Sequence, residues 1–106
     1  MDFNFKRDCR GVISIIGGSE IDSQTKENTI QLGRLLAQHN FAIACGGLGG
    51  TMEAVCKGAK ELSGLTIGII PGEKKALANK YVDIVIPVPF SHGRNLIVVL
   101  TGDIVV

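Results

Sequence analysis

Residues 41–54, FAIACGGLGGTMEA, hold the densest glycine cluster of the chain. An apolar run at 41–45 enters the glycines at 46–50, and a helical pattern begins near Thr51. Apolar residues then follow the spacing of one helix face, starting with Met52. We therefore predict a strand, a tight turn and a helix in that order, which is the repeating unit of a parallel α/β sheet.

The same unit recurs on both sides of this stretch. The apolar run 11–16 enters Gly17-Gly18-Ser19, and a helix is predicted from about Thr25 to His39, with Asn40 as its stop and Leu32, Leu35 and Leu36 on its apolar face. Further strands are predicted at 65–70, 82–87 and 103–106, with a helix from Ser91 to Leu100 between the last two. The pattern predicts an α/β fold, a Rossmann-like doubly wound parallel sheet of about five strands that is incomplete at the C-terminus.

Length and composition narrow the class of protein. The 106 residues fit one domain, 1–106, and the 45% apolar content excludes a disordered tail. Eleven basic against ten acidic residues, with only 5% aromatics, argue against nucleic-acid binding. No segment is long and apolar enough for a membrane span, and no cysteine spacing indicates a metal site. We expect a soluble, cytoplasmic protein with no metal and no bound cofactor.

The two glycine turns indicate a site for a phosphorylated ligand. In a parallel sheet both turns fall on the carboxyl edge, and glycine lets backbone amides approach an anion at a helix N-terminus. There is no P-loop motif, and Cys45-Gly46 replaces the acidic residue that a dinucleotide fold places after its second strand. The predicted phosphate-binding residues are Gly17, Gly18, Ser19, Gly46, Gly47, Gly49, Gly50 and Thr51.

Several polar and charged side chains near the turns have both a structural and a functional interpretation. Glu53 either stabilises the first turn of its helix or contacts a sugar or base. Arg94, beside Asn95, is either a solvated cation or a clamp for phosphate or ribose. His92 is weak evidence for catalysis, and the lysines 74, 75 and 80 form a solvated loop or attract phosphate to the site.

The ordered pieces 16–19, 45–54, 66–72 and 93–95 resemble the LOG-like family of Rossmann-type nucleotide-binding proteins, especially its branch related to molybdenum cofactor carrier proteins. The resemblance implies hydrolysis of the N-glycosidic bond of a nucleoside 5′-monophosphate such as AMP, by a homo-oligomer. It also implies ligand-binding roles for Glu53, Arg94 and Asn95, with Arg94 as the catalytic candidate. The family's downstream P-G-G-x-G-T-x-x-E segment is absent here, so the resemblance implies a chain without the C-terminal part of the family's domain.

Three functions stay open at this point. The chain is a nucleotide-binding domain that, in complete form, is a phosphoribohydrolase; or it is a non-catalytic carrier or sensor of a phosphorylated ligand such as molybdopterin; or it is an inert fragment. The missing glutamate segment favours the carrier. An uncovered apolar strand at 103–106 would also favour self-association or low stability.

Overall fold

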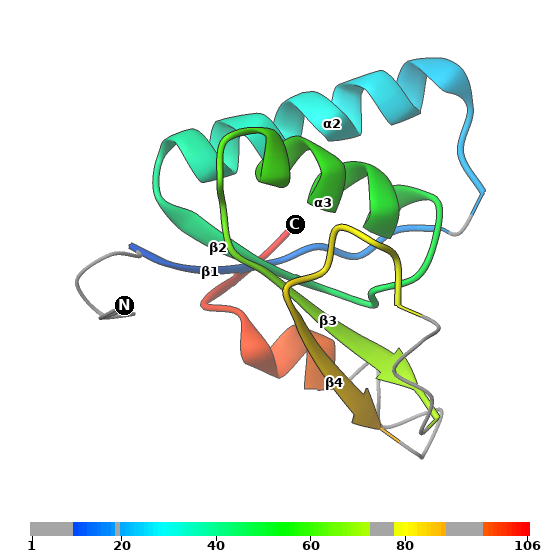
Figure 1. Ribbon diagram of the computed structural model, residues 1–106, viewed down its shortest axis with the longest axis vertical. Coiled ribbons are helices and arrows are strands. Elements are labelled where there is room, and N and C mark those ends of the chain that lie inside the picture. The colour runs from blue at the N-terminus through cyan, green and yellow to red at the C-terminus, as the bar shows by residue number, and fades with distance from the viewer. Residues whose placement is uncertain (1–9, 19, 73–77, 89–96) are drawn as a thin grey trace.

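Five parallel strands form one sheet in the computed structural model, which describes residues 10–18, 20–72, 78–88 and 97–106 (Figure 1). The strand order is β4-β3-β2-β1-β5, and every pair is parallel. The elements are β1 (Gly11–Ser14), α2 (Ser23–Gln38), β2 (Phe41–Cys45), α3 (Thr51–Glu61), β3 (Thr66–Pro71), β4 (Ile84–Val88) and β5 (Ile104–Val105). The predicted Rossmann-like fold is confirmed.

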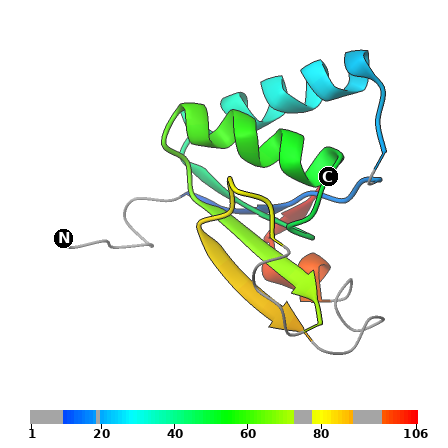
Figure 2. The same ribbon diagram turned by 45° about the vertical axis from the view of Figure 1, so that its right-hand side comes forward.

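Helices cover both faces of this sheet. Helices α2 and α3 lie side by side on one face, and a helical segment, residues 97–101, lies on the other (Figures 1 and 2). Strands β2, β3 and β4 are added in order on one side of β1, and β5 is added on its other side. The carboxyl ends of β1 and β5 therefore flank the topological switch point of the sheet. The predicted Ser91 cap of the second segment lies outside the described residues.

The core lies between the sheet and the pair α2 and α3. Strand β2 occupies the middle of the sheet, and its residues 42–45 are fully buried. Ile13, Ile43 and Val55 belong to one continuous apolar cluster that joins β1, β2 and α3. A nearly unbroken apolar sequence is what a parallel strand covered on both faces requires, so the pattern of 41–45 is explained by its position.

Helix α2 buries only part of the stripe that was predicted: Leu32 and Leu36 pack against the core cluster, and Leu35 does not. Its buried residues include Ile30, Gly33 and Ala37, whereas Leu35 is 51% exposed. The prediction that Leu35 lies on the buried face is therefore wrong. Helix α3 comes closest to α2 over Gly33, in the contact described next. Asn40, the predicted stop, adopts a left-handed conformation with φ 66°.

Two glycines set the close approach of α2 and α3. A Cβ on Gly58 would lie 2.0 Å from the carbonyl oxygen of Ile30, and a Cβ on Gly33 would lie 2.2 Å from that of Val55. The backbones of the two helices therefore touch directly. Arg34 and Glu61 form an ion pair across the same contact, and this partner holds the pKa of Glu61 below its usual value. Glu61 thus pairs with a residue of the neighbouring helix.

Asp22 caps the N-terminus of α2. Its Oδ1 accepts a hydrogen bond of 2.7 Å from the amide of Thr25, and this bond lowers the pKa of Asp22. A lowered pKa means that the stabilisation is present above the pKa of an unfolded aspartate and is lost as the pH falls through the folded value.

We expect Asp22→Ala to lower the free energy of unfolding at neutral pH, because the amide of Thr25 loses its acceptor. The difference from the wild type should shrink below the pKa of an ordinary aspartate, and urea denaturation at a series of pH values measures it. Asp22→Asn is the control, since an asparagine also caps helices but does not titrate, so the difference in stability between Asp22→Asn and Asp22→Ala should not vary with pH. A pH-independent difference for Asp22→Ala would contradict the assignment.

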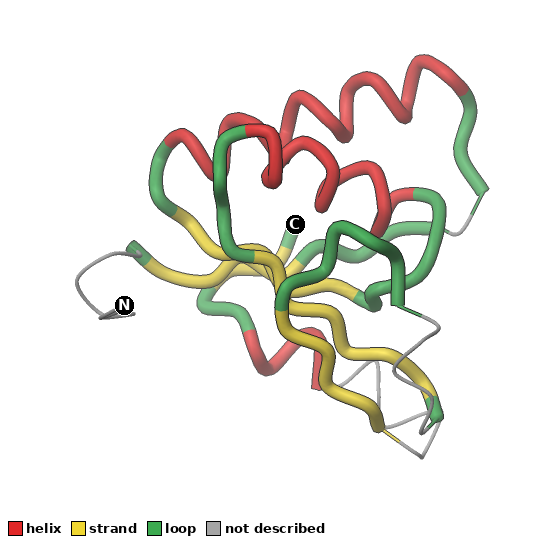
Figure 3. The backbone as a smooth tube through the Cα atoms, in the orientation of Figure 1, coloured by secondary structure: helices red, strands yellow, loops and turns green. Residues whose placement is uncertain are grey.

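An irregular segment, residues 78–83, returns the chain from the carboxyl edge toward β4 (Figure 3). We call it the crossover segment. Hydrogen bonds hold both of its ends. At one end, the backbone amide of Asn79 donates to the Gly47 carbonyl at 2.8 Å, and its Nδ2 donates to the Leu48 carbonyl at 2.8 Å. At the other end, Asp83 accepts hydrogen bonds from Thr66 and from Lys60. These contacts hold residues 78–83, which form neither a helix nor a strand, against the body of the sheet.

None of the helices formed by the described residues is long and apolar enough to cross a membrane.

Candidate functional site

The two glycine turns meet at the carboxyl edge of the sheet, as predicted. The amide of Thr51 donates a 3.0 Å hydrogen bond to the carbonyl of Gly18. A Cβ on Gly17 would lie 2.5 Å from Cγ2 of Thr51, so only glycine allows this approach. The loop after β1 is thereby fixed to the first residue of α3.

The cluster 46–50 divides into a packed half and an open half. Gly46 and Gly47 are buried, and Gly47, with φ 75°, would place a Cβ 3.1 Å from Cα of Gly68. Gly49 has open space around it, and Gly50 takes φ 65° at the N-cap of α3. The amides of Gly49 and Gly50 donate no hydrogen bond to other described residues. The open half is thus the part suited to an anion.

A pocket of about 400 Å³ opens beside this helix N-terminus. Three lysines from three separate elements face it, and we call it the lysine pocket. Lys26 comes from the first turn of α2, Lys57 from α3 and Lys80 from the crossover segment. The rest of its lining is Glu20, Ile21, Gly50, Glu53, Ala54 and Tyr81. The three lysines outnumber the two glutamates in this lining, so the lysine pocket is net positive in an almost neutral chain.

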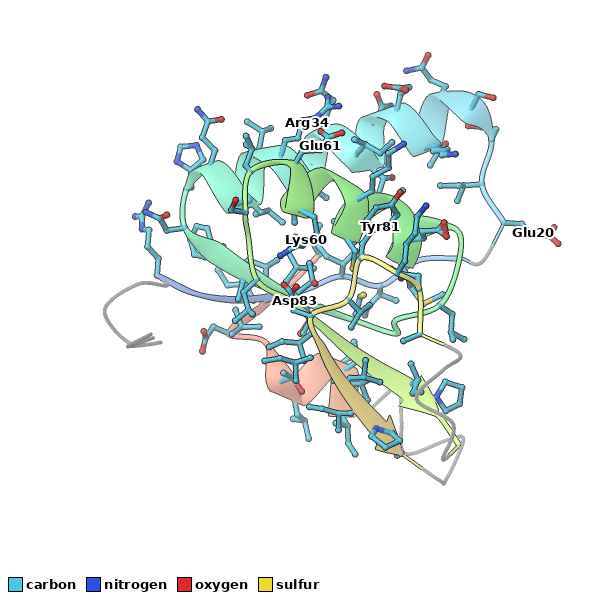
Figure 4. All side chains as sticks on the ribbon, viewed as in Figure 1. Glu20, Arg34, Lys60, Glu61, Tyr81 and Asp83 are labelled. Carbon is cyan, nitrogen blue, oxygen red and sulfur yellow. The ribbon has the colours of Figure 1, made fainter. Side chains whose placement is uncertain are left out.

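The charged side chains that line the lysine pocket are not paired with one another. Glu20, Glu53 and the three lysines form no ion pair or side-chain hydrogen bond with any residue that the structure describes. Lys80 lies 5.2 Å from the ring centre of Tyr81. In Figure 4 Glu20 lies at the outer margin of the molecule and points away from it, whereas Tyr81 lies beside α3. Glu53 and Lys57 share one face of α3, since they are four residues apart.

A second pocket, of about 340 Å³, lies at the switch point. Its lining is mostly apolar, and we call it the apolar pocket: Ile15, Ile16, Gly17, Gly46, Met52, Val98 and Val99. Gly17 lines this pocket and Gly50 lines the lysine pocket, and the hydrogen bond from Thr51 to Gly18 joins the two turns. The carboxyl edge therefore offers a cationic and an apolar surface around one backbone junction.

Sequence reasoning found the loops of this site but not most of its cations. The structure brings together Gly17, Gly18, Gly50, Thr51 and Glu53, while Gly46 and Gly47 are packed beneath them. Ser19, Arg94, Asn95 and His92 lie outside the described residues. Lys26, Lys57 and Tyr81 were not predicted as residues of the site. Their spacing from the glycine turns is the sequence signal that could have identified them. Residues of these types at such a spacing are too common for that signal to be specific.

Cys45 ends β2 immediately before the glycine cluster, and its Sγ lies 3.6 Å from Sγ of Cys56. Both are fully buried and neither is in a disulfide. The hydrogen bond with Cys45 and burial raise the pKa of Cys56. The predicted role of both residues as small buried apolar groups is confirmed.

We expect these two thiols to resist alkylation in the folded protein, because both are fully buried and the raised pKa of Cys56 leaves that residue little thiolate. Reaction with a maleimide at pH 8, followed by mass spectrometry, should modify Cys45 and Cys56 only after urea is added. Rapid labelling of either residue without denaturant would contradict their placement in the core.

The comparisons with known proteins agree on one family and one fold. The profile of the SLOG cluster4 family matches residues 10–106. An uncharacterized protein of Archaeoglobus fulgidus is 42% identical over 91 residues, which cover 86% of this chain and 60% of that protein. The molybdenum cofactor binding protein of the phototrophic bacterium Rippkaea orientalis matches with a TM-score of 0.84 and 35% identity, over 89% of this chain and 59% of its own.

The molybdenum cofactor carrier protein of Chlamydomonas reinhardtii matches with a TM-score of 0.81 and 29% identity, again over 89% of this chain and 59% of its own. The chain therefore spans 59–60% of the length of these relatives. The match confirms the resemblance to LOG-like proteins and to their cofactor-carrier branch.

Proposed function

We propose, from the fact that the chain belongs to the SLOG cluster4 family, that it binds a small phosphorylated ligand at the carboxyl edge of its sheet. The observation that carries this proposal is the lysine pocket beside the open half of the glycine cluster. A phosphate there would meet the N-terminus of α3, the amides of Gly49 and Gly50, and the ammonium group of Lys57. Each of these groups favours a negative charge.

The proposed role is that of a carrier or sensor, which holds its ligand without changing it. Support comes from two structural relatives, one a binding protein and one a carrier protein for the molybdenum cofactor. That cofactor would be cargo here, and a phosphorylated pterin has the size and charge that the pocket suits. The predicted phosphate contacts from Ser19, Arg94 and Asn95 belong to the same proposal.

Phosphorus NMR of the purified chain with AMP tests this proposal, with adenosine followed by proton NMR as the ligand without phosphate. We expect the AMP phosphorus line to broaden in a saturable way and adenosine to be unaffected. A line that stays sharp at millimolar protein would overturn the phosphate site. Arg94→Ala separately tests the Arg94 prediction, since an unchanged affinity would remove that residue from the site.

A second candidate function is hydrolysis of the N-glycosidic bond of a nucleoside 5′-monophosphate. It is favoured by Glu53, because a carboxylate beside bound ribose stabilises the positive charge of an oxocarbenium-like transition state. The same NMR sample tests it through the appearance of ribose 5-phosphate. Product would establish the hydrolase, and broadening without product would leave the carrier.

We also propose that residues 1–106 act as a single cytoplasmic domain of this type and that the chain self-associates. Large apolar side chains are exposed near β5: Leu100 at 70%, Ile104 at 57% and Val106 at 59%. Exposed apolar side chains beside an open strand edge favour association. Sedimentation velocity at micromolar concentration should show a species larger than 11.2 kDa, and a compact monomer would contradict this expectation.

A further inference from the structure

The groups that α3 contributes to the lysine pocket alternate in sign along the helix. Gly50, Glu53 and Lys57 all line the pocket and follow one another on one face of α3. The Gly50 N-cap and Lys57 both favour an anion, and Glu53 lies between them. All three residues are half-buried. A phosphate held by the N-cap and by Lys57 would therefore lie against the carboxylate of Glu53.

The other charged and titratable groups of the pocket leave this carboxylate in place. They are Glu20 before α2, Lys26 on α2, and Lys80 and Tyr81 on the crossover segment. Glu20 is exposed, and in Figure 4 it points away from the molecule. Within the described part of the chain, Glu53 forms no ion pair with any of the three lysines. A fully ionised phosphate would thus meet a second negative charge, and the two would repel each other.

A single proton turns this repulsion into an attraction. A phosphate monoester loses its second proton with a pKa of about 6, so near neutral pH it exists both as a dianion and as a monoanion with one P–OH group. An ionised carboxylate only accepts hydrogen bonds, and the P–OH group donates one. Hydrogen bonds from a hydroxyl to a carboxylate are short and strong. Sulfate carries no such proton near neutral pH.

We propose that Glu53 accepts a hydrogen bond from the P–OH group of a phosphate monoester that is bound as its monoanion, so that the pocket selects phosphate over sulfate. The inference rests on the proposed phosphate site and adds the protonation state of the ligand to it. No covalent bond between heavy atoms changes: the dianion takes up one proton from solvent as it binds. Glu53 is here a specificity-determining residue, while the N-cap and Lys57 supply affinity.

Isothermal titration of the full chain with AMP between pH 5.5 and pH 8.5 tests the proposal. We expect the affinity to fall by about tenfold for each pH unit above about pH 7, because the monoanion becomes scarce. Free glutamate side chains titrate near about pH 4, and those of lysine and tyrosine near about pH 10, outside most of this range. Titrations at pH 8 in buffers of different ionisation enthalpy should show uptake of about one proton per AMP bound.

Glu53→Gln separates the carboxylate from other sources of pH dependence. The amide of glutamine donates a hydrogen bond to a dianion, so AMP affinity at pH 8 should rise by about tenfold or more and the pH profile should flatten. Inorganic phosphate should displace AMP from both proteins, whereas the same concentration of sulfate should displace it only from the variant. Glu27→Gln is the matched control, because Glu27 is exposed on α2 and removes the same charge. It should keep the profile of the wild type.

The outcomes separate the two proposals. An AMP affinity that does not change with pH, or sulfate that displaces AMP from the wild type as well as phosphate does, would overturn the role of Glu53 and leave the phosphate site standing. A pH dependence that persists in Glu53→Gln would also overturn it, because another group, such as His92, would then take up the proton. Absence of AMP binding at every pH would overturn both proposals. Circular dichroism of the two variants confirms that each has folded.

Discussion

Replacing Gly58 with alanine should destabilise the protein by about 3 kcal/mol, although alanine normally stabilises a helix interior by about 0.5–1 kcal/mol relative to glycine. The sign is reversed because the new Cβ would lie 2.0 Å from the carbonyl oxygen of Ile30. The obstacle is backbone, so no side-chain rotation relieves it, and α2 and α3 must separate. Urea denaturation followed by circular dichroism measures the change.

Gly49→Ala is the matched control for this substitution. A Cβ at Gly49 would meet nothing within 4 Å, so the free energy of unfolding should change by less than about 0.5 kcal/mol. Gly33→Ala should behave like Gly58→Ala, because its Cβ would lie 2.2 Å from the Val55 carbonyl oxygen. A raised midpoint for Gly58→Ala would mean that the two helices do not touch in this way.

Replacing Lys57 with glutamine should weaken binding of AMP by about 10- to 100-fold. Lys57 is the pocket lysine on α3, close to the proposed phosphate position, and a charge-assisted hydrogen bond contributes about 1.5–3 kcal/mol. Glutamine keeps most of the length of the side chain and removes the charge. Titration at two salt concentrations should show that the wild type loses more affinity with added salt than the variant.

Arg10→Gln controls for net charge. Arg10 precedes β1 at the opposite edge of the sheet, where its amide donates to the Asn40 carbonyl and its guanidinium lies 5.4 Å from the ring centre of Phe41. The change in charge equals that of Lys57→Gln, so an effect due only to long-range attraction would be similar in both. Unchanged AMP affinity in Lys57→Gln would exclude that lysine from the phosphate site.

The architecture could be predicted because it depends on local patterns. Strand β2 has the predicted bounds, and the glycines of the two turns mark the ends of β1 and β2. The placement of Leu35 on the buried face of α2 was wrong. Helical spacing favours Leu35 as a buried residue, but the two helices approach each other at Gly33 and Gly58. A single glycine in a helical sequence does not show that a second helix packs against it.

The site was predictable in its backbone and not in its side chains. Glycines that follow strands indicate an anion loop wherever they occur, so Gly18 and Gly50 could be placed at one edge. Lys26 and Lys80 come from elements far apart in the sequence, and only the packing of α2 and the crossover segment brings them to one pocket. Surface lysines are common, and nothing local distinguishes these from their neighbours.

The hydrogen bonds of Asn79 link the proposed ligand site to the mobility of the crossover segment. Its side chain and amide hold the carbonyls of Leu48 and Gly47, while its neighbours Lys80 and Tyr81 line the lysine pocket. A ligand that holds Lys80 therefore also holds the crossover segment against the glycine turn. Amide hydrogens of Asn79 and Val82 should exchange with deuterium more slowly when the pocket is filled, while exchange at the far end of α2 stays the same. Occupancy of the pocket would thus be recorded in the exchange rates of a segment that has no helix or strand of its own.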